Sequence, residues 1–502
     1  MSLRILVFLL LVQSAIAQST LYTVQNNGPR SQRLNIVFLS EGYSVADLPN
    51  FAGHVNAAMN YLFSREPWMP YRSYCNVFRI EIASNQSGCD NGSAGLTRDT
   101  YFSTGFTTAS VPQLLTFGGI GQSRAYALLN QHVPEYNIPV VLVNDAKYGG
   151  SGGPISVVSV HSLSAQVVEH EIGHSFAGLA DEYDADYPGY SPSEMPNNTA
   201  QTVRSLIRWN IWIDAATPVP TPETADYDSL VGLFEGSMYR TAGQFRPHNN
   251  SLMRSLNRPV GNVNREQFVL SIYSRVDPVD SWTPAGASFS VSDFQHLSFG
   301  VTTKQPSIGA LQTRWYIDNV LQSGLTTAAM DVISDVIGNG THSVRADIAD
   351  ATTFVRSDPA QLLSQSVSWT VTLANQLPAT LPTWRTAYGS DIANPAKDEF
   401  VNLAKYALGA SPAQPIRATQ RPYVSITAGP GGALYLTLNV PRRTKRSDIS
   451  YDVQISGDLA VWNSGPGYTV TVEDSDDLLV VRDANPISAA QRRSMRLRVQ
   501  AP

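Results

Sequence analysis

The pattern of apolar and polar residues changes near residue 280, and this change constrains the fold more than any other feature. Before it, apolar runs alternate with helical periodicity, which is typical of an α/β layer structure. After it, helical patterns nearly vanish, and short alternating runs between turn residues predict an immunoglobulin-type β-sandwich over 283–374. Residues 375–502 open with a Pro-containing linker and a helix at Lys397–Leu408, then continue as strands. Because 502 residues are more than a single domain with one hydrophobic core usually contains, we expect a multidomain protein.

The first region, 18–282, carries the clearest pattern of elements. Its expected elements are strand 34–39, helix 48–63, strand 76–83, helix 124–132, strand 139–144, a Gly-rich loop YGGSGG from Tyr148, and strand 154–160. A helix around residues 167–176 follows directly. Strands that alternate with helices in this way predict an α/β layer structure.

The N-terminus reads as a signal peptide over 1–17. One Arg precedes an apolar run from Ile5 to Val12, and Ala15-Ile16-Ala17 forms a small-x-small cleavage site. Later apolar runs stay below the roughly 18 residues of a membrane span, so we expect a secreted protein, extracellular or periplasmic, without such a span. After export, Cys75 and Cys89 would by default form a disulfide; buried free thiols or half of a metal site are the alternatives.

Composition and charge argue against several classes of partner. Charged residues make up 15% of the chain, and the net charge of −6 is spread along it rather than gathered in a block. Nothing in this pattern indicates binding to nucleic acid or to an anionic membrane, and we expect a monomer. Sequons for N-glycosylation stand at Asn85, Asn91, Asn197, Asn249 and Asn339.

The stretch VVEHEIGHSFAGLADEYD carries the chemistry of the chain. One face of the expected helix is an apolar stripe with a spacing of four residues: Val168, Ile172 and Phe176. His170 and His174 project together on another face, so they can give two nitrogens to one zinc ion. Glu171 then stands beside the open coordination position as general base for a zinc-activated water. The alternative interpretation is a solvated or inactive helix.

A third protein ligand must arrive after the helix has ended. Gly178 can adopt a positive φ and let the chain turn back toward the metal. In the metzincin pattern a glycine follows the second histidine by three residues, and the third ligand follows that glycine by three. Here Ala177 holds the usual glycine position, and Asp181 lies three residues beyond Gly178. We therefore expect Asp181 as the ligand, with Glu182 and then His248 as alternatives.

The motif HEIGHSFAGLADEY resembles the signature of the immunoglobulin A peptidase family of bacterial secreted zinc metallopeptidases. LNIVFLSEGYSVADLPNF, YGGSGG and FEGSMYRTAGQFRPHNNSLMRS are similar to further stretches of that family, so the resemblance covers roughly 34–275. It implies a zincin-like, more closely metzincin-like, catalytic domain over 18–282, with Met253 in a turn beneath the metal. Many relatives carry cysteines after this methionine, and this chain has none there.

The two later segments resemble other modules less specifically. WYIDN, GNGTHSVRADIAD and SWTV resemble an Ig-like module of related secreted proteins, and DEFVNLAKYALGASP with SYDVQISGDLAVW resembles a C-terminal module of exported bacterial proteins. The linker SDIANPAKDEF keeps too few carboxylates to favour calcium. The basic cluster RRTKR, Arg442 to Arg446, indicates a solvated β-turn face, with an anionic polymer as the alternative.

Two functions fit this sequence. The first is a secreted zinc-dependent endopeptidase that binds one zinc ion per chain through His170, His174 and Asp181 and hydrolyses protein or peptide substrates. The second is a catalytically inactive zincin-like domain in a binding or adhesion protein, whose β modules bind a surface or glycan. Retention of both histidines together with Glu171 favours the enzyme.

Two finer expectations concern the substrate of such an enzyme. An extended peptide would pair with the edge strand ahead of the motif helix, which the sequence places at ISVVSV behind the YGGSGG loop. A tyrosine hydroxyl from the chain near the methionine turn would donate to the oxyanion of the tetrahedral intermediate. Tyr239 is the expected donor, and Tyr183 is the rival.

Overall fold

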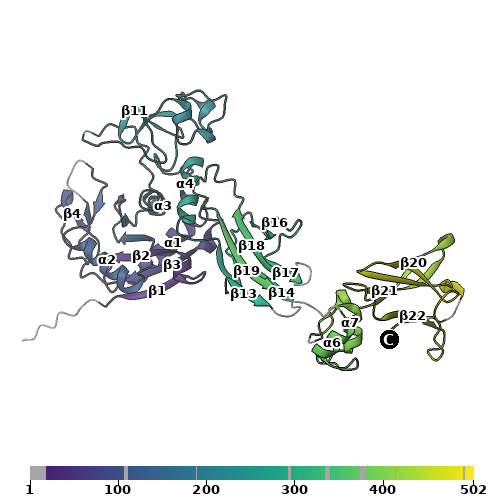
Figure 1. The fold of residues 1–502 in the computed structure, drawn as a ribbon. Helices are drawn as coiled ribbons and strands as arrows, with labels where there is room; N and C mark the ends of the chain where they lie inside the picture. The colour runs from purple at the N-terminus through teal and green to yellow at the C-terminus, as the bar shows by residue number, and fades with distance from the viewer. Residues whose placement is uncertain are drawn as a thin grey trace, which may run out of the picture.

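A computed structural model describes residues 18–106, 111–187, 189–291, 296–333, 340–373, 380–412, 414–489 and 492–502. Figure 1 shows three bodies along the chain: an N-terminal α/β region, a pair of sheets packed against it, and a C-terminal unit that lies apart. The expected signal peptide, 1–17, lies outside the described residues. None of the helices within the described ranges is long and apolar enough to cross a bilayer.

The N-terminal region is built on a six-stranded sheet with the order β1-β3-β2-β7-β9-β8. Its strands are β1 (Thr20–Gln25), β2 (Leu34–Glu41), β3 (Cys75–Glu81), β7 (Ile138–Val143), β8 (Gly150–Ser151) and β9 (Ser156–Ser159). The central strands run parallel, whereas β1 and β8 pair antiparallel with their neighbours at the two edges. The predicted α/β pattern of this region is thereby confirmed.

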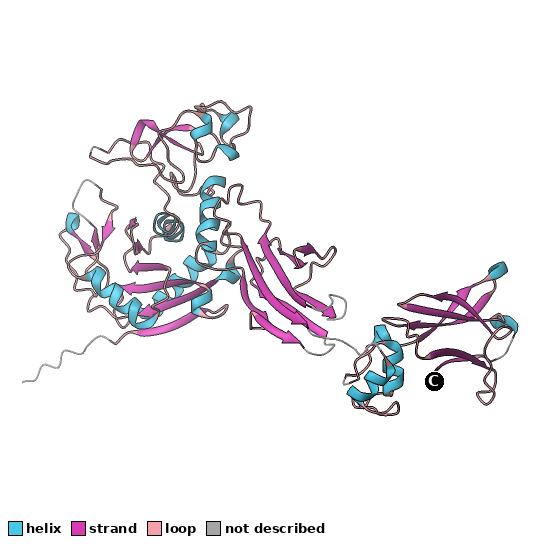
Figure 2. Ribbon diagram, viewed as in Figure 1, coloured by secondary structure: helices cyan, strands magenta, loops and turns pink. Residues whose placement is uncertain are grey.

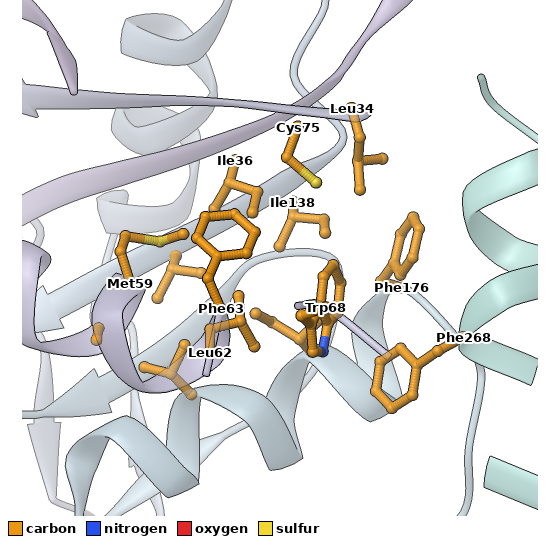
Figure 3. Packing of buried hydrophobic residues seen from close by; sticks show 14 of the residues in the cluster. Leu34, Ile36, Met59, Leu62, Phe63, Trp68, Cys75, Ile138, Phe176 and Phe268 are labelled. Carbon is orange, nitrogen blue, oxygen red and sulfur yellow. The ribbon is translucent and has the colours of Figure 1, made fainter. Parts of the chain in front are cut away.

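Helices cover both faces of this sheet (Figure 2), as the complete burial of β2 requires. Alternate side chains of β2 enter two different cores. One core packs against α1 (Leu48–Leu62) and α3 (Ser164–Ser175), and the other packs against α2 (Gly121–His132). Figure 3 shows part of the first core, where Ile36 and Leu62 lie near Trp68 and Phe176. The sheet and α1 therefore hold α3 rigidly from one side.

Shorter elements complete the N-terminal region. They are the strands β4 (Asp90–Asn91), β5 (Gly105–Phe106) and β6 (Leu115–Thr116), the hairpin β10 (Phe234–Ser237) and β11 (Arg240–Arg246), the helix α4 (Asn262–Tyr273), and short 3-10 helices including Arg204–Leu206, Asn210–Trp212 and Ala225–Tyr227. The hairpin lies in a loop-rich segment on one side of α3, and α4 lies between the sheet region and the following pair of sheets (Figure 1).

Two further sheets share one core after residue 278. Their strands are β12 (Val279–Thr283), β14 (His296–Thr303) and β17 (Ala329–Ile333) in the first sheet, and β13 (Ser288–Val291), β15 (Leu311–Ile317), β16 (Val320–Leu321), β18 (Gly340–Asp350) and β19 (Ser364–Leu373) in the second. The stacked indoles of Trp315 and Trp369 lie in that core. The prediction of β structure here is confirmed; its immunoglobulin-like character stays a prediction.

The pair of sheets is docked on the N-terminal region through buried polar contacts. The hydroxyls of Tyr71 and Tyr273 both donate to Asp350 Oδ2, at 2.6 and 2.7 Å. Asp280 forms ion pairs with Arg33 and Lys304, whose Nη1 and Nζ atoms each lie 2.6 Å from Asp280 Oδ1. Paired buried groups of this kind fix one orientation, because any displacement would leave a desolvated charge or hydroxyl without its partner.

Over its described residues, the C-terminal unit contains two α-helices and two sheets. Its elements are α6 (Leu381–Tyr388), α7 (Asn402–Leu408), the sheet of β20 (Tyr423–Ala428), β21 (Leu434–Pro441), β24 (Leu478–Asp483) and β23 (Thr469–Asp474), and the pair β22 (Ser450–Ser456) and β25 (Ser494–Gln500). The expected linker is wrong from Leu381 onward, because Leu381 and Trp384 bury against Tyr406 and stabilise a helix there. Residues 375–379 of that linker lie outside the described ranges.

The expected disulfide is wrong, since both cysteines are free and buried. Cys75 lies at the start of β3 in the core beneath α1, and Cys89 lies in the core on the other face of the sheet (Figure 3 labels Cys75). The sheet separates the two thiols. Burial raises the pKa of Cys75 to about 12 and also raises that of Cys89, beside Asp145, so neither thiol is a ready nucleophile.

Candidate metal centre

The motif forms the helix α3, as predicted, and its two faces have separate functions. Val168 and Ile172 lie in the core that α1 and the sheet enclose, so the helix cannot rotate. The helix ends at Ser175, and Gly178 has a φ of +63°, which reverses the chain as expected. The amide of Leu179 donates to the Gly173 carbonyl at 2.9 Å and closes this turn.

Three donor atoms meet at the surface of α3, and we call them the metal-facing triangle: His170 Nε2, His174 Nε2 and Asp181 Oδ1. The two nitrogens are 3.1 Å apart, and they lie 3.1 and 3.2 Å from the oxygen. Ligand atoms of a tetrahedral zinc site are separated by about 3.3 Å, given bonds of about 2.0 to 2.1 Å. The residues present therefore fit a zinc ion.

Backbone carbonyls fix the two imidazole rings of the triangle. His170 Nδ1 lies 3.0 Å from the Leu252 carbonyl oxygen, and His174 Nδ1 lies 2.8 Å from that of Leu179. A carbonyl only accepts, so each Nδ1 carries the proton and donates it. The Nε2 lone pairs are thereby directed toward each other and toward Asp181, which is the orientation that a metal-binding histidine needs.

The charges of the triangle depend strongly on one another. Burial is the largest single influence and lowers the pKa of both histidines, but the hydrogen bonds to the Asp181 carboxylate, together with the negative charges of Asp181 and Glu171, outweigh it. The pKa of His174 is thereby raised to about 9, and that of His170 lies above its usual value. In turn, the two imidazoles outweigh the burial of Asp181 and hold its pKa far below the usual range. The carboxylate is therefore ionised at neutral pH and carries a full negative charge into the site.

The two alternative ligands lie elsewhere. Glu182 is completely buried and accepts hydrogen bonds from Asn197 Nδ2, Asn264 Nδ2 and Ser251 Oγ, at 2.9, 2.9 and 2.7 Å. We call these four residues the Glu182 network. His248 accepts a hydrogen bond from the Asn262 amide at the start of α4. Neither residue belongs to the His170, His174 and Asp181 group, so geometry favours Asp181 as the third ligand.

The Glu182 network supports the triangle from behind. The amide of Glu182 donates to the Met253 carbonyl at 2.9 Å, and Met253 packs under α3, where a Cβ on Gly173 would meet its sulfur at 2.8 Å. Asn197 bonds both the amide and the carbonyl of Ala180, directly before Asp181. Because Asn197 is fully buried, its sequon is inaccessible in the folded protein.

Glu171 lines a cavity of about 510 Å³ together with the three members of the triangle. Burial raises the pKa of its carboxyl above the usual value, although the two histidines oppose the shift. A Cβ at Gly150 or Gly152 would lie 3.1 or 3.0 Å from a Glu171 carboxylate oxygen. The glycines of YGGSGG therefore allow β8 to approach the Glu171 carboxylate closely.

Tyr239 and Tyr183 both line this cavity. Tyr239 Oη donates to Asp181 Oδ2 at 2.7 Å, and Tyr239 occupies the left-handed region with a φ of +58°, as does Met238 at +46°. Two such residues in one hairpin turn cost free energy, which is typical of a functional site. The Tyr183 ring lies parallel to His170, with centroids 6.1 Å apart.

The expected substrate strand is wrong. The strand ISVVSV forms β9, which pairs with β7 on one side and with β8 on the other, so it has no free edge. The outer strand is β8, which forms within the expected Gly-rich loop. At Gly150 its outer side is bridged to Leu114, and Gly150 donates to the Gln113 carbonyl at 3.2 Å. The rim of the cavity is therefore formed by β8 and the segment 111–114.

Comparison with known proteins finds one family to which the N-terminal region is similar. A family model described as IgA Peptidase M64 matches residues 22–227, which include the whole triangle. No curated protein matches the chain. Two solved structures are similar only weakly: an endo-beta-1,4-mannanase from Thermotoga petrophila (13% identity, TM-score 0.15, 28% of each chain covered) and a chitinase from Bacillus thuringiensis (8%, 0.13, 54% of this chain and 41% of that one). The chain thus spans less than half the length of either, and such TM-scores support no conclusion about fold.

Proposed function

We propose, from the premise that residues 22–227 belong to the IgA Peptidase M64 family, that this chain is a secreted zinc-dependent endopeptidase. The observation that carries the proposal is the metal-facing triangle of His170, His174 and Asp181, with Glu171 beside it in one cavity. Family membership supports peptide hydrolysis. Two imidazole nitrogens and one carboxylate oxygen are a donor set that suits zinc.

In this mechanism the residues of the chain have distinct roles. His170, His174 and Asp181 would hold the zinc ion, while the Leu252 and Leu179 carbonyls orient the two rings. When bound, zinc supplies a Lewis acid that polarises the scissile carbonyl and acidifies water.

Glu171 would take a proton from the attacking water onto its carboxylate and then deliver it to the leaving amine nitrogen. Its raised pKa, caused first by burial, suits a group that must both accept and release a proton near neutral pH. The closeness of Gly150 and Gly152 to its carboxylate supports this role, because side chains there would crowd the space in which water and substrate meet.

Tyr239 remains our choice as donor to the oxyanion, with Tyr183 as the rival. Because the Tyr239 hydroxyl bonds Asp181, a second role is available to it, namely orienting the third ligand. The variant Tyr239→Phe distinguishes the two. Loss of an oxyanion donor lowers kcat about 10- to 1000-fold with zinc affinity unchanged, whereas loss of an orienting bond weakens zinc binding as well. Tyr183→Phe is the matched comparison.

The first test of the proposed function is metal content and turnover. Purified mature protein from zinc-replete medium is expected to hold about one zinc per chain and to hydrolyse casein. A chelator should abolish hydrolysis, and added zinc should restore it. Protein that lacks stoichiometric zinc would falsify the proposal, and zinc-bound protein that cleaves nothing would favour an inactive zincin-like domain in a binding protein.

A further inference from the structure

The two sheets of the C-terminal unit share a core but differ in size. Over the described residues, the first sheet has four strands in the order β20-β21-β24-β23, and the second is the pair β22 and β25. Residues of β22 line a cavity with β23 and β24, whereas residues of β25 line a groove with β20 and β21. The second sheet therefore ends above β21, and no described strand covers β20.

The part of the first sheet that extends beyond β25 is apolar. Its ladder places six side chains on one face: Val424, Ile426, Ala428, Leu434, Leu436 and Leu438. Leu438 packs with Leu497 of β25 and is 4% exposed, whereas Val424 and Ile426 are 49 and 59% exposed. In a β-sandwich such a face is covered by a strand of the opposite sheet. The position beside β25 and above β20 lacks that strand.

The groove at this position has a volume of about 480 Å³. Alternate residues of β25, namely Met495, Leu497 and Val499, form part of its lining, and Val424 and the helix α7 complete it. β25 pairs with β22 alone, and its backbone makes no other backbone hydrogen bond within the described ranges. One edge of β25 is therefore free where the groove opens, and its N–H and C=O groups can bond an added strand.

The residues of β25 that alternate with this apolar set include two exposed arginines, Arg496 and Arg498. The Arg496 guanidinium lies 4.1 Å from the ring centroid of Trp462, which holds it on the outer face of the strand. Arg498 stands opposite Asp452 in the ladder and forms no ion pair within the part of the chain that the structure describes. Like charges on neighbouring strands repel and opposite charges attract. The edge thus disfavours a second copy of β25 and favours a strand with acidic residues.

We infer that the free edge of β25 binds an extended segment of another protein as an added strand. Apolar residues at alternate positions of this segment fill the groove, and acidic residues between them face Arg496 and Arg498. Main-chain hydrogen bonds supply affinity in such strand addition, and side-chain pockets supply specificity. The inference is independent of the peptidase activity, because the C-terminal unit lies apart from the metal-facing triangle (Figure 1). Binding there would hold the N-terminal region near the partner without blocking its cavity.

The test is fluorescence anisotropy of labelled short peptides with the full-length protein. In the first peptide, valine alternates with glutamate. Lysine replaces glutamate in the second peptide, and serine replaces valine in the third. The fourth peptide has the sequence of the first, but each of its backbone amide nitrogens is methylated, so it cannot donate hydrogen bonds to β25.

Two variants with matched controls test the protein side. Val424→Ser removes a half-exposed apolar side chain from the groove, and its control is Val470→Ser, on the strand β23 and outside the groove. Arg498→Gln removes an exposed charge. Its control is Arg314→Gln, because Arg314 is likewise exposed on a strand and stands opposite Asp347. All four variants should fold, which the thermal midpoint checks.

The valine–glutamate peptide should bind about tenfold more tightly than the valine–lysine peptide, and the serine and methylated peptides should not bind at about 1 mM. Val424→Ser should lose about tenfold in affinity and Arg498→Gln about threefold, while both controls bind as wild type. If Val424→Ser has a lowered thermal midpoint, Arg498→Gln and its control decide.

Several results would overturn the inference. They are absence of binding of the valine–glutamate peptide at about 1 mM, equal binding of the lysine or the methylated peptide, and equal affinity of each variant and its control. Sedimentation of the protein alone tests the other occupant. A dimer that Val424→Ser dissociates and Val470→Ser does not would assign the groove to a second copy of this chain, and would also overturn the inference.

Discussion

Asp181 and Glu182 are neighbours in the sequence, yet the regions that they enter are built in opposite ways. In the metal-facing triangle, Asp181 Oδ1 and two imidazole nitrogens converge within 3.1 to 3.2 Å, with their lone pairs directed at one another. In the Glu182 network, each carboxylate oxygen accepts hydrogen bonds from neutral donors. Acceptor atoms that converge on one point suit the binding of a cation. A carboxylate whose oxygens both accept hydrogen bonds from the protein is suited to holding neighbouring segments in place.

The two carboxyls also differ in charge preference. The histidines hold the pKa of Asp181 far below its usual range, although burial opposes them. Burial raises the pKa of Glu182, although its three hydrogen bonds oppose the shift. Negative charge is thus favoured at Asp181 in the triangle, whereas the Glu182 network is held together mainly by hydrogen bonds from neutral groups. Burial alone therefore does not identify a ligand; the chemistry of the partners does.

The largest expected effect comes from Glu171→Gln, which keeps the shape of the general base and removes its proton affinity. We expect kcat to fall by about 10²- to 10⁴-fold, because water loses its proton acceptor and the amine its donor. Zinc content should stay at the wild-type level, since Glu171 is not part of the triangle. Casein turnover and metal analysis on the same preparation check this. Wild-type turnover in the variant would contradict the assigned role.

The next effect concerns the triangle itself. Asp181→Ala should weaken zinc binding by more than about 100-fold, beyond the 10- to 100-fold typical of lost supporting contacts. Competition with a chromogenic chelator measures the affinity directly, without relying on activity. If Asp181→Ala binds zinc as tightly as wild type, the comparison with Glu182 fails and the third ligand is another residue.

A smaller effect is expected from Glu182→Gln in the supporting network. With its oxygen toward the Asn197 and Asn264 amides, the new side chain would place an NH2 donor against the Ser251 hydroxyl, which donates to Glu182 in the wild type, at a cost of about 1 to 3 kcal/mol in stability. Zinc affinity should fall about tenfold, because the Asp181 segment loosens.

Glu266→Gln is the control for Glu182→Gln. Glu266 is also a buried carboxylate that accepts three hydrogen bonds, from Trp212 Nε1 and from the amides of Arg356 and Ser357. It should lower the thermal midpoint to a similar extent and leave zinc affinity unchanged. Equal zinc affinities of the two variants would show that the Glu182 network does not support the triangle.

The smallest effect on the metal site is expected from Asp280, which lies outside it and pairs with two cations. Burial opposes ionisation of Asp280, but Arg33 and Lys304 hold its pKa below the usual value. A depressed folded-state pKa contributes stability above the unfolded value of about 4, and this contribution is lost as pH falls through the folded value. Asp280→Asn leaves the buried Arg33 and Lys304 side chains without their anion and should therefore cost about 3 kcal/mol at pH 7. Its thermal midpoint should approach that of wild type below about pH 4; a constant difference would contradict this.

Much of the N-terminal region could be predicted from the sequence. The strands β2, β3 and β7 and the helices α1, α2 and α3 lie within a few residues of the predicted positions, because hydrophobic periodicity reflects burial directly. The helix α6 and the strand β8 could not be predicted. Leu381 and Trp384 form a helix because Tyr406 packs against them, and Gly150 joins the sheet because α3 and β9 leave room only for glycine.

The sequence by itself determined the pairing of His170 with His174, because residues four apart on a helix share a face through hydrogen bonds within one turn. It also determined that the chain would turn at Gly178. Only the tertiary structure places Asp181 and Glu182 in different surroundings, since the hydrogen-bond partners of Glu182 stand 15, 69 and 82 residues away in the sequence. It likewise placed Cys75 and Cys89 on opposite faces of one sheet. Contacts between distant residues depend on how the whole core packs, and no local spacing records them.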